Sequence, residues 1–108
     1  MTKTDPSFRD FVLDQLAGLG DVTCRAMFGG HGLYCGGVFF AILWAGRLFL
    51  KTGDQTRRSY IDAGSGPFRP SDKQTLKTYY EVPVDVLEDA DRLAEWANVA
   101  MAVARAVS

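Results

Sequence analysis

The sequence predicts an α+β domain of two layers, in which helices pack on an antiparallel sheet of about five strands. The middle of the chain holds short apolar runs separated by glycines, and both ends show helical spacing of apolar residues. A chain of 108 residues with 47% hydrophobic content can also form one core without disulfides or metals. We therefore expect a single domain over residues 1–108, with the element order α-ββββ-α-β-α.

The first helix is expected to begin at Asp5-Pro6 and to end at Gly18 or Gly20. Aspartate is a favourable N-cap, and proline fits the first turn because its missing N–H would be unpaired there anyway. Helical spacing gives this segment one stripe, formed by Phe8, Phe11, Val12, Gln15, Leu16 and Leu19. We expect this stripe to face the sheet.

Four strands are expected to follow, at about Val22–Phe28, His31–Cys35, Val38–Trp44 and Arg47–Lys51. The turn signals between them are Gly29-Gly30, Gly36-Gly37 and Ala45-Gly46. Glycine accepts the positive φ angles that tight hairpin turns require. Loops this short exclude parallel crossovers, so the four strands should be antiparallel neighbours.

Two-residue turns would fix the register of these strands. They place four pairs opposite one another: Phe28 and His31, Arg25 and Tyr34, Cys24 and Cys35, and Tyr34 and Phe39. One face then holds Phe28, Leu33, Val38, Phe40, Ile42, Trp44 and Phe49. The other face holds Met27, Tyr34, Phe39, Leu43, Leu48 and Leu50. Because both faces are apolar, either a β-bulge shifts one register or each face is covered, and a second copy of the chain is one candidate cover.

The second half of the chain begins with a short helix over residues 55–63, with Asp54 as its cap and Gly64 as its stop. Tyr60 and Ile61 are expected to form the buried side of this helix. Residues 64–72 are expected to form a turn-rich loop that Phe68 anchors to the core. A strand over Gln74–Val82 should place Leu76, Thr78, Tyr80 and Val82 on one face, and Pro83 should end it.

At the C-terminal end, the sequence predicts a short turn over Val84–Glu88 and a long helix from Asp91 to about Val107. The apolar stripe of this helix is formed by Leu93, Trp96, Ala97, Ala100, Met101 and Ala104. Its many alanines should allow close approach to a neighbouring element.

A set of motifs extends over nearly the whole chain. It begins with Arg25-x-Met27-Phe28-Gly29-Gly30-x-Gly32-Leu33-Tyr34, Gly37-x-Phe39-Phe40-Ala41 and Leu48-x-Leu50-Lys51. It continues with Gly64…Pro67-Phe68, Tyr79-Tyr80-Glu81-Val82-Pro83 and Leu93…Trp96-Ala97…Ala100. Together these motifs resemble the N-terminal domain of the TfoX/Sxy competence-regulator family.

This resemblance implies an α+β domain without known catalytic activity. Full-length members of the family promote expression of DNA-uptake competence genes together with the cyclic-AMP receptor protein. They carry a second, C-terminal helical domain, whereas this sequence stops at Ser108, so the resemblance predicts a stand-alone N-terminal domain. The family offers no established ligand residues to carry over.

Cys24, Cys35 and His31 are the residues that would first suggest metal binding or nucleophilic catalysis. Zinc sites usually need four closely spaced ligands, and a Cys–His pair needs a third orienting group. We therefore predict no metal site, no catalytic residues and no cofactor, with both cysteines as free thiols packed on adjacent strands. Arg25 is expected to stack on Tyr34 or to pair with an acidic residue.

Charge is unevenly distributed, although the formal net charge is only −1. Residues 47–77 hold seven basic and three acidic residues, whereas residues 81–105 hold six acidic and two basic residues. The candidate contact residues are Arg47, Lys51, Arg57, Arg58, Arg69, Lys73 and Lys77. With Tyr79 beside them they could meet phosphates, although an ordinary solvated surface is the simpler interpretation. The two oppositely charged segments could also pair copies of the chain head-to-tail.

Two functions are consistent with these features. The first is a non-enzymatic regulatory or adaptor domain that acts by protein–protein contact, with the transcription machinery or a second copy of the chain as the expected partner. The alternative is a nucleic-acid-associated module that uses the basic segment 47–77. The longest apolar run, Val38–Ala45, is too short to span a bilayer, and the N-terminus lacks a signal-peptide core, so we expect no membrane contact and a cytoplasmic location.

Overall fold

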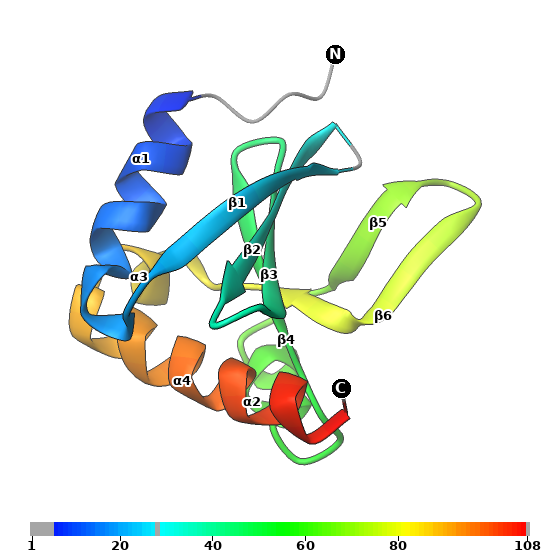
Figure 1. Ribbon diagram of the computed structural model, residues 1–108. Coiled ribbons are helices and arrows are strands. Elements are labelled where there is room, and N and C mark those ends of the chain that lie inside the picture. Colours follow the sequence, from blue (N-terminus) through cyan, green and yellow to red (C-terminus); the bar gives the residue numbers. More distant parts are fainter. Residues whose placement is uncertain (1–5, 28, 108) are drawn as a thin grey trace.

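Within the described residues, 6–27 and 29–107, six β-strands form one antiparallel sheet in the order β1-β2-β3-β4-β6-β5 (Figure 1). The structure is a computed structural model. The strands are β1 (Val22–Met27), β2 (Gly30–Cys35), β3 (Val38–Trp44), β4 (Arg47–Lys51), β5 (Pro67–Ser71) and β6 (Gln74–Glu81). The predicted α+β class is confirmed.

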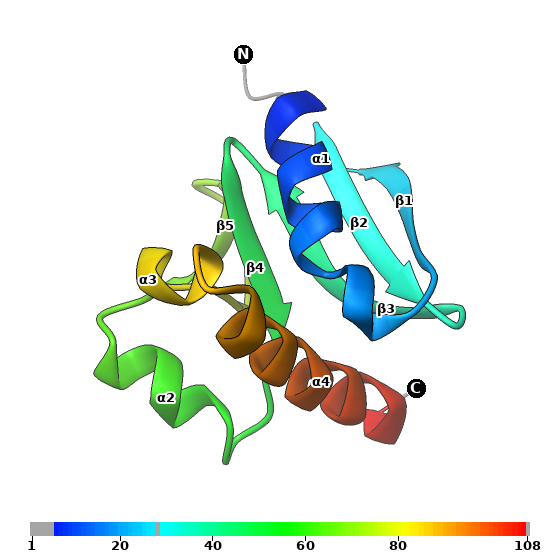
Figure 2. The same ribbon diagram turned by 90° about the vertical axis from the view of Figure 1, so that its left-hand side faces the viewer.

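The helices of this part of the chain are α1 (Pro6–Gln15), the 3-10 turn η1 (Ala17–Leu19), α2 (Arg57–Asp62), α3 (Val84–Leu87) and α4 (Ala90–Val107). Figure 2 shows α1 and α4 lying on the same side of the sheet. None of the described helices is both long enough and apolar enough to cross a lipid bilayer.

The main core lies between the sheet and helices α1 and α4. Val12 of α1 and Leu16, which follows the helix, are fully buried, whereas Phe11 is 41% exposed and does not belong to the buried stripe. From α4, the predicted stripe is buried at Leu93, Ala97, Ala100, Met101 and Ala104, and Trp96 packs against it. The small alanine side chains let α4 lie close to β3 and β4.

A second apolar cluster lies on the opposite face of the sheet. Phe68 of β5 is fully buried, and its ring centroid lies 4.8 Å from that of Phe49 and 5.5 Å from that of Trp44. Ile42 and Tyr79 complete this cluster. Both faces are therefore covered from within the chain, and the two-sided apolar pattern does not require a second copy.

A β-bulge in β3 shifts the register between β2 and β3. Leu33 pairs with Ala41, whereas its neighbour Tyr34 pairs with Phe39, so Phe40 lies between the two partners. The pairing of Tyr34 with Phe39 is confirmed. Both expectations for the two-sided pattern are also met, since a bulge shifts one register and each face is covered, although the cover comes from the chain itself. The extra residue reverses the alternation of side chains along the rest of β3.

The predicted grouping of residues on each face is wrong because it does not include this reversal. Ile42, Trp44 and Phe49 pack together with Phe39, on the face opposite Leu33. Conversely, the leucines predicted to share a face with Phe39 lie against the helices: Leu43, Leu48 and Leu50.

The first hairpin also differs from the prediction. Met27 pairs with Gly30, which places the connection one residue earlier than expected, and Gly30 lies inside β2. Cys24 is therefore opposite Leu33 and Arg25 is opposite Gly32, so the predicted Cys24–Cys35 and Arg25–Tyr34 oppositions are wrong. The predicted opposition of Phe28 and His31 lies outside the described residues.

The predicted contact of Arg25 with Tyr34 still forms. The guanidinium carbon of Arg25 lies 5.3 Å from the centroid of the Tyr34 ring. The two residues are diagonal rather than direct neighbours, and long side chains bridge this spacing in a sheet. The expected stacking is confirmed.

Residues 64–72 were predicted to form a loop, but they contain strand β5, which brings the number of described strands to six. β5 runs from Pro67 to Ser71 at the edge of the sheet, where a proline costs no ladder hydrogen bond on its outer side. Phe68 anchors this segment as expected.

The prediction that Leu76 and Tyr80 of β6 share a face is also wrong. Pro67 pairs with Tyr80 but the next residue, Phe68, pairs with Leu76, so the register shifts along β6. As a result Leu76 packs in the second cluster, whereas Tyr80 packs in the main core.

The ends of the short helices follow from local hydrogen bonds. α2 begins two residues later than predicted, and Asp54 forms an ion pair with Arg57 at 3.2 Å instead of capping the helix. Gly64 ends α2 as predicted, with φ +81° and its N–H donating to the carbonyl of Ile61. At α1, Pro6 is the first helical residue, and the expected cap Asp5 lies outside the described residues.

Candidate functional site

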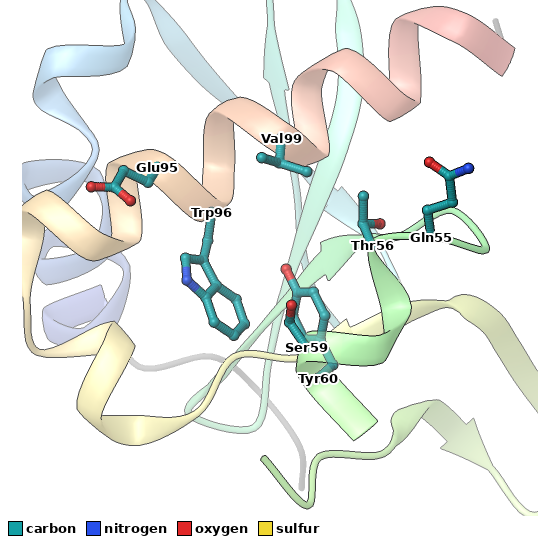
Figure 3. A pocket seen from close by; sticks show the side chains of 7 residues that line it. All are labelled: Gln55, Thr56, Ser59, Tyr60, Glu95, Trp96 and Val99. Atoms are coloured by element: carbon teal, nitrogen blue, oxygen red, sulfur yellow. The ribbon is translucent and has the colours of Figure 1, made fainter. Parts of the chain in front are cut away.

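A pocket of about 360 Å³ lies between helices α2 and α4 (Figure 3). Its volume is near the lower end of the range for ligand pockets, about 300–1,000 Å³, and suits one or two amino-acid side chains. The lining residues are Gln55, Thr56, Ser59, Tyr60, Glu95, Trp96 and Val99.

The floor of this α2–α4 pocket is aromatic. The rings of Tyr60 and Trp96 meet edge to face, with centroids 4.7 Å apart and an interplanar angle of 71°. Tyr60 is only 4% exposed, and burial raises its pKa well above that of a free phenol. The phenol therefore stays neutral at physiological pH, and the two rings form a fixed, uncharged surface.

The rim of the pocket is polar at its ends and apolar at its side. In Figure 3, Glu95 lies at one end and Gln55 and Thr56 lie at the other, with Val99 between them. Glu95 is exposed and forms no ion pair with any residue that the structure describes. Val99 is 48% exposed, which is high for a valine.

Hydrogen bonds hold the start of each helix that forms the pocket. The Thr56 hydroxyl accepts from the N–H of Gly53 at 2.8 Å, in the turn before α2. The Asp89 carboxylate caps α4 by accepting from the N–H groups of Asp91 at 3.1 Å and Arg92 at 3.2 Å. The pocket is therefore formed by two locally fixed helices.

Four of the seven predicted basic contact residues have partners inside the domain. Arg47 pairs with Glu81 at 3.4 Å, and Arg58 pairs with Asp62 at 3.0 Å. Arg57 donates from Nε to the Thr52 hydroxyl, and Lys51 donates from Nζ to the Thr78 hydroxyl, both at 3.0 Å. Lys51 thus links β4 to β6, and Arg57 links α2 to the residue that follows β4.

The other three basic residues lie together on the β5–β6 hairpin. Arg69, Lys73 and Lys77 are exposed, and their side chains form no ion pair or hydrogen bond with other described parts of the chain. Figure 1 shows this hairpin on the side of the sheet away from α1 and α4. Among the seven candidates, only this hairpin group thus has charges without a partner in the described residues.

Tyr79 is not available as a surface ring beside these cations. It is 7% exposed, its ring stacks on Phe39 at 5.2 Å, and Nζ of Lys51 lies 5.2 Å from its centroid. Burial raises its pKa to about 12. The predicted basic face with aromatic residues consequently lacks this aromatic member.

The thiols and the histidine are separated by the observed register. Cys24 and Cys35 are free thiols, and burial raises the pKa of Cys24. The described ranges contain no group of three or more His, Cys, Asp or Glu that could hold a metal ion. His31 Nδ1 is buried without a hydrogen-bond partner among the described residues.

The sequence as a whole was compared with known proteins. The family model of the TfoX N-terminal domain matches residues 14–104. The chain belongs to the TfoX N-terminal domain family. The search of curated proteins finds no match. The matched range of this TfoX N-terminal domain includes the whole α2–α4 pocket and the β5–β6 hairpin.

The sequence predicted Tyr60 and Trp96 on buried helix sides but did not identify them as a site. Ile61, predicted to be buried beside Tyr60, is 51% exposed, so that part of the prediction is wrong. Tyr60 and Trp96 are far apart in the chain of this TfoX N-terminal domain, and no local pattern indicates that they meet. One signal was present: Trp96 is the only aromatic residue in a helix of small apolar residues. A large ring in such a stripe needs a partner across the interface, and that partner is Tyr60.

Proposed function

We propose that this TfoX N-terminal domain is a non-enzymatic regulatory or adaptor domain that binds a protein partner through the α2–α4 pocket. Its family membership supports a regulatory role, and a partner in the transcription machinery is the corresponding expectation. The observation that carries the proposal is the fixed aromatic floor of the pocket, open to solvent beside Val99.

The composition of the pocket suits contact with a protein side chain. Tight protein contacts concentrate in well-packed pockets with aromatic residues, surrounded by a polar rim. Tyr60 and Trp96 supply the aromatic surface, whereas Glu95 and Gln55 supply the polar rim. A partner residue inserted here would also cover the exposed side chain of Val99.

Affinity capture with matched lysine variants tests the proposal. Val99→Lys places a charge inside the pocket, and Val84→Lys places the same charge on α3, where Val84 is 66% exposed and does not line the pocket. Both sites are exposed, so both variants should remain folded. We expect the wild type and Val84→Lys to capture the same partner from host lysate, and Val99→Lys to lose it. Equal capture by all three would overturn the proposal.

A nucleic-acid-associated role is the second candidate, and the free charges of Arg69, Lys73 and Lys77 favour it. Cationic side chains that contact phosphates release counterions, so binding should weaken steeply with salt. We expect replacement of all three by Gln to abolish binding of a labelled DNA duplex at low salt. Arg58→Gln is the matched control, because Arg58 is already paired with Asp62. No anisotropy change for the wild type at about 50 mM salt would exclude this candidate.

A further inference from the structure

The α2–α4 pocket combines an aromatic floor with a carboxylate that has no counterion among the described residues. We propose that it binds an arginine side chain from an exposed segment of the partner protein. This inference rests on the proposed function and adds the chemistry by which the partner is recognised.

The charge of the pocket favours a cation. Glu95 is the only ionised residue among those that line the pocket. Three basic side chains of the two helices pair with other carboxylates: Arg57 with Asp54 at 3.2 Å, Arg58 with Asp62 at 3.0 Å and Arg92 with Asp85 at 3.1 Å. A cation that enters the pocket would therefore meet an uncompensated negative charge.

A second carboxylate strengthens this argument. Asp91 lies one helical turn before Glu95 on α4 and is also exposed, without an ion pair among the described residues. Like charges four residues apart on a helix repel each other. A cation bound near Glu95 would relieve that repulsion, whereas an acidic or purely apolar partner residue would not.

The aromatic floor favours a flat cation. Tryptophan is the best aromatic partner for a cation within about 6 Å of its ring, and arginine provides such contacts more often than lysine. The guanidinium is planar, stacks on rings and can donate two parallel hydrogen bonds to a carboxylate. Trp96 and Glu95 both line the pocket, so an arginine side chain that enters it would meet an indole ring at the floor and a carboxylate at one end (Figure 3).

The domain already uses this type of contact elsewhere. The Arg57 guanidinium carbon lies 5.9 Å from the centroid of Tyr80, and Arg25 lies 5.3 Å from that of Tyr34. Both of these contacts join an arginine and a ring of the same chain. In the α2–α4 pocket the rings and the carboxylate are present, and the arginine would come from the partner.

Nuclear magnetic resonance of the two indole N–H groups tests this inference. The probe is a blocked glycine peptide with a single central arginine, compared with peptides that carry lysine or glutamate at the same place. The chain has two tryptophans, and Trp44 packs in the second cluster on the other side of the sheet, so its signal is an internal control. Trp96→Phe assigns the two signals.

We expect the arginine peptide to move the Trp96 signal with a dissociation constant of roughly 1 mM, and the Trp44 signal to stay in place. Lysine should bind more weakly, and glutamate should not bind. Glu95→Gln should weaken arginine binding about tenfold, whereas Glu88→Gln, which changes an exposed carboxylate outside the pocket, should leave it unchanged.

Two results would overturn the inference: a Trp96 signal that does not move at about 10 mM arginine peptide, or equal binding by the wild type and Glu95→Gln. If either result were found while Val99→Lys still lost partner capture, the pocket would contact the partner through a group other than an arginine side chain. Failure of the proposed function is recognised separately, by Val99→Lys capturing the partner as well as the wild type does.

Discussion

Phe68 is the large apolar side chain that anchors strand β5 to the rest of the domain. Its ring is fully buried against Phe49 and Trp44, in a segment otherwise rich in glycine, proline and polar residues. Such a segment has little other apolar surface, so its one large ring must supply the packing. This is why the sequence could predict the anchoring role of Phe68 without predicting the strand that carries it.

We expect Phe68→Ala to lower the free energy of unfolding by about 3–5 kcal/mol, through lost burial and the cavity that remains. The same substitution at Phe11, which is 41% exposed, should cost less than about 1.5 kcal/mol. Urea denaturation of the two variants measures this difference. Equal losses would show that Phe68 does not have the burial described here.

The phenol of Tyr79 makes the stability of the domain sensitive to high pH. Its pKa is raised to about 12 by burial, whereas the unfolded chain should titrate near about 10. The folded state thus keeps the proton longer, and this contribution to stability is complete below about pH 10 and is lost as the pH rises towards about 12.

We expect the free energy of unfolding to fall by roughly 2 kcal/mol between about pH 9 and about pH 12 on account of Tyr79 alone. Tyr79→Phe has no proton to lose, so its stability should decline less over the same range. Denaturation curves at several pH values check this, with the difference between the two proteins as the readout. The same pH dependence in both would contradict the account.

At the scale of the element, glycines determine where the strands turn and where they touch. The short apolar runs bounded by glycines predicted four strands of the meander within one or two residues. The first turn was misplaced because Gly30 looks like a turn glycine in the sequence. In the structure it lies within β2, against the backbone of Leu43, and is needed for close approach rather than for a positive φ.

Gly30→Ala should therefore be strongly destabilising. A Cβ at this position would overlap the carbonyl oxygen of Leu43, which is backbone and cannot move aside alone. We expect a loss of about 2–4 kcal/mol by thermal or chemical denaturation. Gly18→Ala is the matched control, since nothing lies within 4 Å of a Cβ there, and it should change stability by about 0.5 kcal/mol or less. Wild-type stability in Gly30→Ala would contradict the observed pairing.

The bulge at Phe40 and the edge strand β5 could not be derived from local sequence patterns. Phe39, Phe40 and Ala41 are all apolar, so no change of period marks where the alternation reverses. Pro67 and Pro70 make β5 look like a loop, and only its place at the sheet edge permits a strand. In both cases the deciding interaction is with a strand elsewhere in the chain.

At the scale of the whole molecule, the sheet separates two apolar clusters, and the helices on one face leave the α2–α4 pocket at their junction. The fold class could be predicted because the spacing of apolar residues in each helix and strand can be read within a short segment of the sequence. The pocket did not, because Tyr60 and Trp96 meet only when α2 and α4 have both packed on the sheet. Charge counts indicated the basic segment, but only the structure separates its paired members from the free hairpin group.

The central claim is that the α2–α4 pocket contacts a protein partner, and site-specific photo-crosslinking tests it most directly. A photo-reactive phenylalanine analogue is placed at position 99, inside the pocket, or at position 84, which is exposed on α3. After irradiation of the full chain in its host, mass spectrometry identifies the linked proteins. The account predicts one reproducible partner linked from position 99 and absent from position 84. The same partner linked from both positions, or none from position 99, would contradict it.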